Sequence, residues 1–343
     1  MRATFTQEQS DLEKTVRSVA EGERAHARHC LEHGWSAPAS DAGLLRDFAV
    51  LGVPEADGGV GSSLVDLMIA VEALGRWAVP SRLSVHAAAV QALVGSDVDL
   101  EPALEGREVW ALAVDEPGVS GWAGLADRAD APAAKTLVPD IGADAVVALG
   151  TDGARLVDAA GCDWTSRESL DEARPLADVV VTGAARASGP TQAEGPLRSA
   201  LVVAAELCGL TQGALALAGD HARSRQQFGR VIGSFQGVAF QLADVAVAGK
   251  AAWDLTVHAA WAVENGRPDA AIQAHAAKAA AGKAAVFAAE RCIQVHGGMG
   301  ITREADPHLY LRRAFVLDAT LGAGSWHRRR VGELRIAATA PRP

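Results

Sequence analysis

The part of the chain after residue 190 is dominated by long alanine-rich runs, and these constrain the fold more than any other feature. Their apolar spacing follows the period of an α-helix. Alanine at facing positions lets neighbouring helices approach closely, which favours an antiparallel bundle. We therefore predict a C-terminal four-helix bundle domain over residues 190–335. Its expected helices are 194–226, 234–264, 268–294 and roughly 305–335.

The two segments that precede residue 190 have different sequence patterns. Residues 1–105 show helical periodicity, broken by the loop "PEADGGVGSS", and predict an all-helical domain. Residues 106–185 contain short β-rich runs such as "EVWALAV" and "ADVVVTG", separated by Gly, Asp and Pro. These runs leave no room for crossover helices, so we expect a small antiparallel β domain. The predicted fold class is α+β, mainly α.

Composition excludes several classes of function. The chain has 32 Lys and Arg against 42 Asp and Glu, a formal charge of −10, which argues against non-specific binding of nucleic acid. Its four cysteines are scattered and the N-terminus lacks an apolar signal core, which favours a cytoplasmic protein. The run "AAKAAAGKAAVFAAERC" is interrupted by charges at Lys278, Lys283 and Glu290, so we expect no membrane span.

Two motifs bear on ligand binding. "QVHGGMG" at 294–300 follows a predicted helix and lacks the G-x-G-x-x-G spacing of a dinucleotide fingerprint. Taken alone, it indicates a helix end and a sharp turn. "RSRQQFGRVIGSFQ" at 223–236 marks a helix break, where a guanidinium could bind a pyrophosphate and Phe228 could stack on a planar ring. A solvated basic turn is the alternative interpretation of this second motif.

Together, these motifs resemble the acyl-CoA dehydrogenase family. The order is a helix, "RQQFGRVIGSFQ", two alanine-rich helices, then "CIQVHGGMGITREADPHLYLRRA". "LGVPEADGGVGSSLVDLMIAVEALGR" and "VDEPGVSG" are also similar to that family, so the resemblance covers nearly the whole chain. It implies FAD bound across a subunit interface. Arg225, Gln227 and Phe228 would contact its pyrophosphate and adenosine. Gln294, Gly297 and Gly298 would receive the ADP portion of a neighbour's FAD, with Gln236 as a helper.

The sequence departs from the family at the catalytic base, the carboxylate that removes the α-proton of an acyl-CoA. The matching positions hold Leu321 or, with a gap, Ala323, and the alternative position early in the bundle holds Ser199. None of these is an acid, so we predict no catalytic residue in this chain. Glu206 and Asp318 are the remaining candidates for a base. The alternative for Glu206 is a carboxylate paired with a nearby Arg or a partner chain.

The expected flavin-ring pocket also departs from the family. Leu137 and Pro139 stand where that family often has ring contacts, and Asp115 replaces a Thr. Leu cannot donate a side-chain hydrogen bond and Pro lacks an N–H. The sequence therefore lacks the hydrogen-bond donors expected around the flavin ring, while it keeps the motifs expected to bind the ADP portion of FAD.

Two other clusters of residues could bind a metal or an anion. His26, His29, Cys30 and His33 have helical ligand spacing, but their charged helix favours a solvated face, and we predict no metal. The basic run "SWHRRR" at 325–330 could meet the 3′-phosphate of CoA or an acidic partner, although exposed surface is the commoner use.

These observations predict an FAD-binding subunit that supplies the ADP side of a shared FAD site to a catalytic partner. The expected partners are an acyl-CoA substrate, a homologous subunit in a dimer or heterotetramer, and an electron-accepting flavoprotein. One alternative is a homomeric dehydrogenase with an unrecognised carboxylate base. Another is a scaffold subunit that keeps the fold without flavin.

Overall fold

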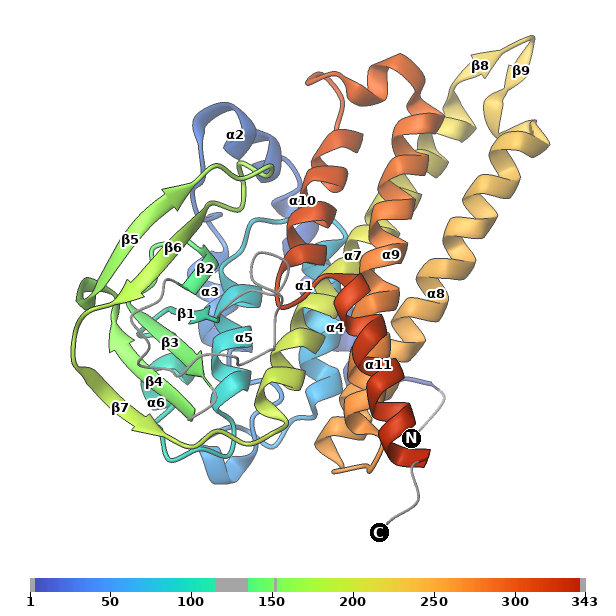
Figure 1. Ribbon diagram of the computed structural model, residues 1–343. Coiled ribbons are helices and arrows are strands. Elements are labelled where there is room, and N and C mark those ends of the chain that lie inside the picture. Colours follow the sequence, from blue (N-terminus) through green and yellow to red (C-terminus); the bar gives the residue numbers. More distant parts are fainter. Residues whose placement is uncertain (1–3, 115–134, 151–152, 340–343) are drawn as a thin grey trace.

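A computed structural model describes residues 4–114, 135–150 and 153–339. Its elements form a helical layer, a small β region and a long helical bundle (Figure 1). The N-terminal helices are α1 (Gln7–Gly22), α2 (His26–His33), α3 (Asp41–Phe48), η1 (Glu55–Asp57), α4 (Leu64–Gly75), α5 (Leu83–Leu93) and α6 (Glu101–Leu104). Thr6 caps α1 in a capping box with Gln9.

The central region contains two sheets. One has the strand order β1-β3-β4-β7 and the other the order β2-β6-β5. The strands are β1 (Trp110–Ala113), β2 (Lys135–Pro139), β3 (Ala145–Gly150), β4 (Gly153–Asp158), β5 (Cys162–Arg167), β6 (Leu176–Val181) and β7 (Ala185–Gly189), with η2 (Ala159–Gly161) between β4 and β5. The predicted antiparallel pairing holds for every described pair of the two sheets except β1 with β3, which is parallel. A parallel pair needs a long connection, and here it includes β2 of the other sheet.

The bundle contains one more helix than the sequence predicted. Its elements are α7 (Gly195–Ser224), β8 (Gln226–Gln227), β9 (Arg230–Val231), η3 (Ile232–Ser234), α8 (Gln236–Glu264), α9 (Ala270–His296), η4 (Gly297–Ile301), α10 (Pro307–Ala319) and α11 (Gly324–Thr339). The expected helix over 305–335 is interrupted between α10 and α11, where Leu321 has φ 53° and Gly322 has φ 100°. Backbone in this left-handed region cannot continue an α-helix.

Helix α7 lies at the centre of the molecule and packs against the N-terminal layer through glycines. A Cβ on Gly209 would lie 2.1 Å from the carbonyl oxygen of Glu72 on α4. The two helix backbones therefore touch where they cross, which places Glu206, one turn earlier on α7, at the junction with the β region. Helix α7 is long and apolar enough to cross a membrane, but 78% of its most apolar window is buried, as in a core helix.

Candidate functional site

The two sequence motifs lie at the same end of the bundle. Helix α7 ends at Ser224, and the chain turns back through the short hairpin of β8 and β9 before α8 begins (Figure 1). Phe228 and Gly229 form the hairpin turn with φ values of 54° and 76°. Helix α9 runs to this end as well, and η4 follows it directly. The hairpin and the glycine-rich turn are therefore neighbours.

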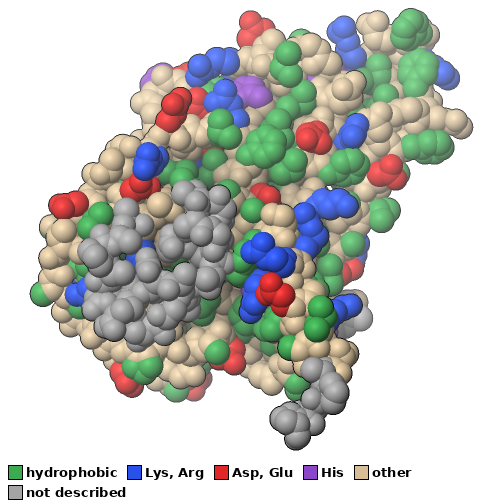
Figure 2. Space-filling view, in the orientation of Figure 1, with side chains coloured by type: hydrophobic (Ala, Val, Ile, Leu, Met, Phe, Trp, Pro, Cys, Tyr) green, Lys and Arg blue, Asp and Glu red, His purple; other side chains and the backbone are tan. Residues whose placement is uncertain are grey.

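A ring contact joins the two segments. The imidazoles of His221, in the last turn of α7, and His296, the last residue of α9, are stacked with centroids 4.1 Å apart. All the residues predicted for the ADP side lie at this end and are exposed: Arg225, Gln227, Phe228, Gln236, Gln294, Gly297 and Gly298. Phe228 is 91% exposed, and hydrophobic side chains gather around this tip (Figure 2).

The chemistry of this end fits an anionic, planar ligand. Arg223 is paired with Asp220, and the guanidinium of Arg230 lies 4.0 Å from the ring centroid of Phe235. Arg225 makes no ion pair within the described residues and is free to bind a phosphate. A Cβ added to Gly297 or Gly298 would meet no atom within 4 Å, so this turn is open to close approach by a ligand.

A second candidate region is a small cavity where the β region meets the bundle. Its volume is about 30 Å³, which is the space of roughly one water molecule. The lining residues are mostly apolar: Ser84, Val85, Ala88, Leu112, Val114, Thr136, Leu137, Pro139, Arg174, Leu176, Val203, Glu206, Leu317, Thr320 and Leu321.

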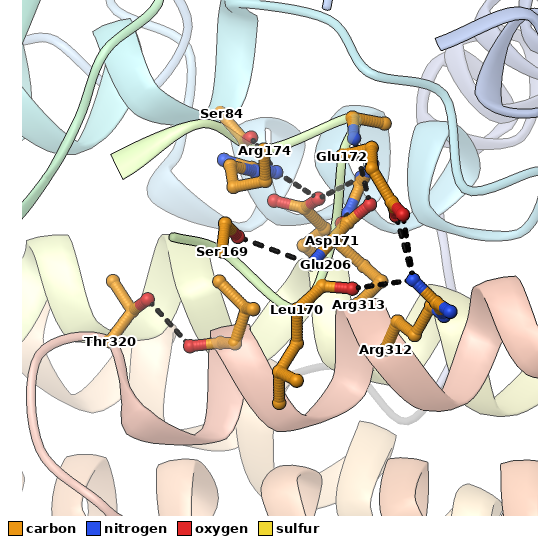
Figure 3. Close-up of polar contacts among 12 residues, drawn as sticks. Ser84, Ser169, Leu170, Asp171, Glu172, Arg174, Glu206, Arg312, Arg313 and Thr320 are labelled. Carbon is orange, nitrogen blue, oxygen red and sulfur yellow. Dashed lines mark hydrogen bonds and ion pairs between the residues drawn. The ribbon is translucent and has the colours of Figure 1, made fainter. Parts of the chain in front are cut away.

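The polar end of this cavity is closed by a buried chain of alternating charges (Figure 3). Arg174 pairs with Glu206, Glu206 lies 3.3 Å from Arg313, and Arg313 pairs with Asp171. All four side chains are buried. Burial raises the pKa of Glu206, but the charges of Arg174 and Arg313 outweigh burial and lower the pKa below its usual value. Glu206 is therefore a stable carboxylate and a weak base.

This arrangement matches the alternative interpretation of Glu206, a helix carboxylate paired with Arg. The sequence did not identify Arg174 or Asp171, which lie in the β5–β6 connection, or Arg313 on α10. Of these three residues, only Arg313 has a sequence pattern that could have indicated a buried position. It lies four residues after Leu309 and four before Leu317, both buried, so it occupies a core position of its helix.

The positions expected to hold a base are apolar or hydrogen-bonded. Leu321 lines the cavity, and the Ser199 hydroxyl donates to the carbonyl of Ala88 at 2.7 Å. Asp318 does not line the cavity. One of its carboxylate oxygens lies 1.8 Å from where a Cβ of Gly282 on α9 would be, so Asp318 faces α9. Ala323 follows Leu321 in the same connection and is half-buried.

Two of the five leucines that line the cavity share an unusual backbone conformation. Leu137 and Leu321 have φ values of 57° and 53°, in the left-handed region that side chains rarely adopt. Leu137 and Pro139 line the cavity. Asp115 lies outside the described residues.

The two remaining clusters are the histidines and cysteine at 26–33 and the basic run at 325–330. Among residues 4–114, 135–150 and 153–339 no group of three or more His, Cys, Asp or Glu could hold a metal. The run "SWHRRR" is not simply exposed surface, because Trp326 and His327 are buried. The Nδ1 atoms of His327 and His275 are 2.8 Å apart, while Arg329 and Arg330 pair with Glu333 on the surface.

Comparisons with known proteins identify the family. Residues 6–97 match the acyl-CoA dehydrogenase N-terminal domain, and residues 194–334 match the acyl-CoA dehydrogenase C-terminal domain. Acyl-CoA dehydrogenase FadE34 of Mycobacterium tuberculosis is 35% identical over 96% of this chain. The chain spans only 48% of the length of FadE34.

Two further proteins are also similar to this chain. Acyl-CoA dehydrogenase IpdE2 of Mycobacterium tuberculosis is 34% identical, over 78% of this chain and 76% of its own length. The solved structure of the Tcur3481-Tcur3483 steroid ACAD superposes with a TM-score of 0.82 at 27% identity, covering 98% of this chain and 99% of that one.

The chain therefore belongs to the acyl-CoA dehydrogenase family. Members of this family are flavoproteins that bind FAD and oxidise CH–CH bonds. The predicted fold class is confirmed, with helices, a central β region and a helical bundle in the expected order. The prediction of FAD is confirmed at the level of the family. The assignment of individual residues to the cofactor remains a prediction.

Proposed function

We propose that this chain is a subunit of an acyl-CoA dehydrogenase and supplies the ADP side of an FAD site whose flavin ring lies in a catalytic partner. One observation carries the proposal. The ADP-side residues form an open, exposed end of the bundle, whereas the one acid among the described residues that line the chain's own ring-side cavity is Glu206, which is paired with Arg174 and Arg313.

The roles of this chain's residues follow from their chemistry. The exposed guanidinium of Arg225 would bind the diphosphate, and the aromatic ring of Phe228 would stack on a planar group. The turn at Gly297 and Gly298 would allow the ligand to approach the backbone. Bound FAD would supply the hydride acceptor for α,β-dehydrogenation of an acyl-CoA. The base that removes the α-proton would come from the partner.

The relatives support a two-module arrangement. FadE34 is about twice as long as the part that this chain matches, which leaves room for a second module of similar size. The Tcur3481-Tcur3483 protein carries two component names and is a steroid ACAD. We propose a homologous chain as the partner, a bulky acyl-CoA such as a steroid side chain as the substrate, and a separate electron-accepting flavoprotein. A cytoplasmic location is part of the same proposal.

Substitution of Arg225 tests the ADP-side assignment. Arg225→Ala should lower FAD occupancy of the purified complex, because a charge-assisted hydrogen bond contributes roughly 1.5–3 kcal/mol, or about 10- to 150-fold in affinity. Arg223→Ala is the matched control, since Arg223 lies two residues away and is paired with Asp220. Equal FAD occupancy in the Arg225→Ala variant and the wild type would contradict the assignment.

A homomeric dehydrogenase is the second candidate, and one observation favours it: Glu206 lines the cavity. If Glu206 were the base, Glu206→Gln would abolish turnover while leaving FAD bound. Our proposal expects the complex to keep its turnover when the variant is folded, because the base belongs to the partner. The scaffold alternative predicts no flavin in any complex of this chain.

A further inference from the structure

The stacked pair of His221 and His296 lies at the seam between the two ADP-side segments. The ring centroids are 4.1 Å apart and the ring planes are inclined by 23°. Both residues are half-buried, and each lies in the last turn of a long helix of the bundle. The backbone N–H of Arg225 donates to the carbonyl of His221 at 2.8 Å, so the pair and the exposed guanidinium are part of one local structure.

The hydrogen bonds of the pair leave room for an added proton. Nδ1 of His296 lies 2.8 Å from the carbonyl oxygen of Cys292, so Nδ1 carries the hydrogen and Nε2 keeps a lone pair. The ring of His221 makes no hydrogen bond within the described residues, and it too has one unprotonated nitrogen when neutral. Two charged rings stacked at this distance would repel each other, so the pair should accept one proton.

The charges around the pair suggest that an added proton would strengthen the binding of an anionic ligand. Helices α7 and α9 both end here, and helix C-termini carry partial negative charge that disfavours anions. In the empty site, burial, His296 and Arg225 hold the pKa of His221 below its usual value. Besides the exposed acids Glu290 and Glu304, the other charged or titratable groups on the flanking segments 218–236 and 288–306 are Asp220, Arg223, Arg230, Arg291, Cys292, Arg303 and Asp306.

Those other groups have partners of their own. Asp220 pairs with Arg223, Arg28 pairs with Asp306, and Arg303 donates to the carbonyl of Leu31. Arg230 and Arg291 lie over the rings of Phe235 and Phe287, and burial raises the pKa of the Cys292 thiol to about 12, so it stays neutral. The basic groups of these two segments that are left to respond to a bound phosphate are Arg225, whose charge is fixed, and the histidine pair.

We propose that His221 and His296 form a proton-coupled part of the ADP-side site and take up one proton when a diphosphate ester binds beside Arg225. This inference rests on the proposed function, because it assumes that the ligand is the ADP portion of FAD. Binding should strengthen as the pH falls, because binding is coupled to the uptake of a proton. One coupled proton corresponds to a change of about tenfold in affinity per pH unit.

The test is calorimetric titration with ADP-ribose, whose phosphates are both esterified and do not titrate near neutral pH. The purified chain and its complex with a homologous partner are titrated between pH 5.5 and 8, in two buffers of different ionisation enthalpy. We expect an uptake approaching one proton and affinity that rises as the pH falls. His221→Phe and His296→Phe each keep an aromatic ring and remove one titrating imidazole, so each should reduce the proton uptake and the pH dependence. Both effects should disappear in the double variant that carries both substitutions.

Two controls separate this inference from the proposed function. His33→Phe changes an exposed histidine on α2 and should titrate like the wild type. Arg225→Ala should weaken binding at every pH while the pH dependence remains. Binding of ADP-ribose without proton uptake, or uptake that persists unchanged in the double histidine variant, would overturn the inference and leave the proposed function intact. If neither the chain nor the complex binds ADP-ribose, both proposals fail.

Discussion

Glu206 on α7 lies 3.3 Å from Arg313 on α10, and both side chains are almost completely buried. Arg174 contacts the same carboxylate from the β5–β6 connection, so one acid joins the bundle to the β region. A carboxylate placed in this way stabilises the domain junction and cannot easily accept a substrate proton.

The charge of Glu206 should matter for stability. Glu206→Gln leaves two buried guanidinium groups without their shared anion, and we expect a loss of about 3–5 kcal/mol in the free energy of unfolding. Urea denaturation measures this loss. Glu333→Gln is the control, because Glu333 pairs with Arg330 on the surface and should contribute no more than about 1 kcal/mol. Similar small losses in both variants would contradict a structural role for the buried charges.

The crossing of α4 and α7 gives a second prediction. Gly209→Ala would place a methyl group 2.1 Å from the carbonyl oxygen of Glu72, and the helices would have to separate. We expect destabilisation of about 1–3 kcal/mol or more, the usual range for overpacking. Gly332→Ala, on the exposed side of α11 with no atom within 4 Å, should instead stabilise by roughly 0.5–1 kcal/mol. A thermal melt compares the two, and an unchanged Gly209→Ala melt would refute the close crossing.

Features of the fold and of the candidate site could be predicted where the residues that form them are close together in the sequence. The long helices were predictable because alanine-rich periodicity is local, and the turn after α9 was predictable because its residues are contiguous at 294–300. The parallel pairing of β1 with β3 was not, because a strand's own pattern does not specify its neighbour.

Features formed by distant residues were mostly missed. The break between α10 and α11 depends on the left-handed conformation of Leu321, a residue type that rarely adopts it, although Gly322 beside it was a signal. The buried charge chain draws Asp171 and Arg174 from a loop that no sequence pattern connects to Glu206. Tertiary packing alone brings these groups together.

The buried histidines predict a loss of stability in mild acid. Burial lowers the pKa of His275 to about 4 and that of His327 to about 2, whereas both titrate near 6.5 in the unfolded chain. Between pH 6.5 and about 4 the unfolded state therefore binds more protons, and the free energy of unfolding should fall as the pH falls. Each histidine contributes up to about 1.4 kcal/mol per pH unit.

Urea denaturation at several pH values checks this slope. His275→Gln should reduce it, whereas His33→Gln, an exposed control, should not. His86, whose pKa burial also lowers to about 4, keeps part of the slope in either variant. Stability that does not change between pH 6.5 and 4.5 would show that these histidines are not buried as described.

The central claim is that this chain contributes half of an FAD site and has no complete site of its own. The most direct measurement is the flavin absorbance of the chain purified alone and purified with a co-expressed homologous partner, before and after addition of an acyl-CoA. We predict that the chain alone is colourless and that the complex is yellow and bleached by its substrate. A chain that is yellow alone and bleached by an acyl-CoA would contradict the claim.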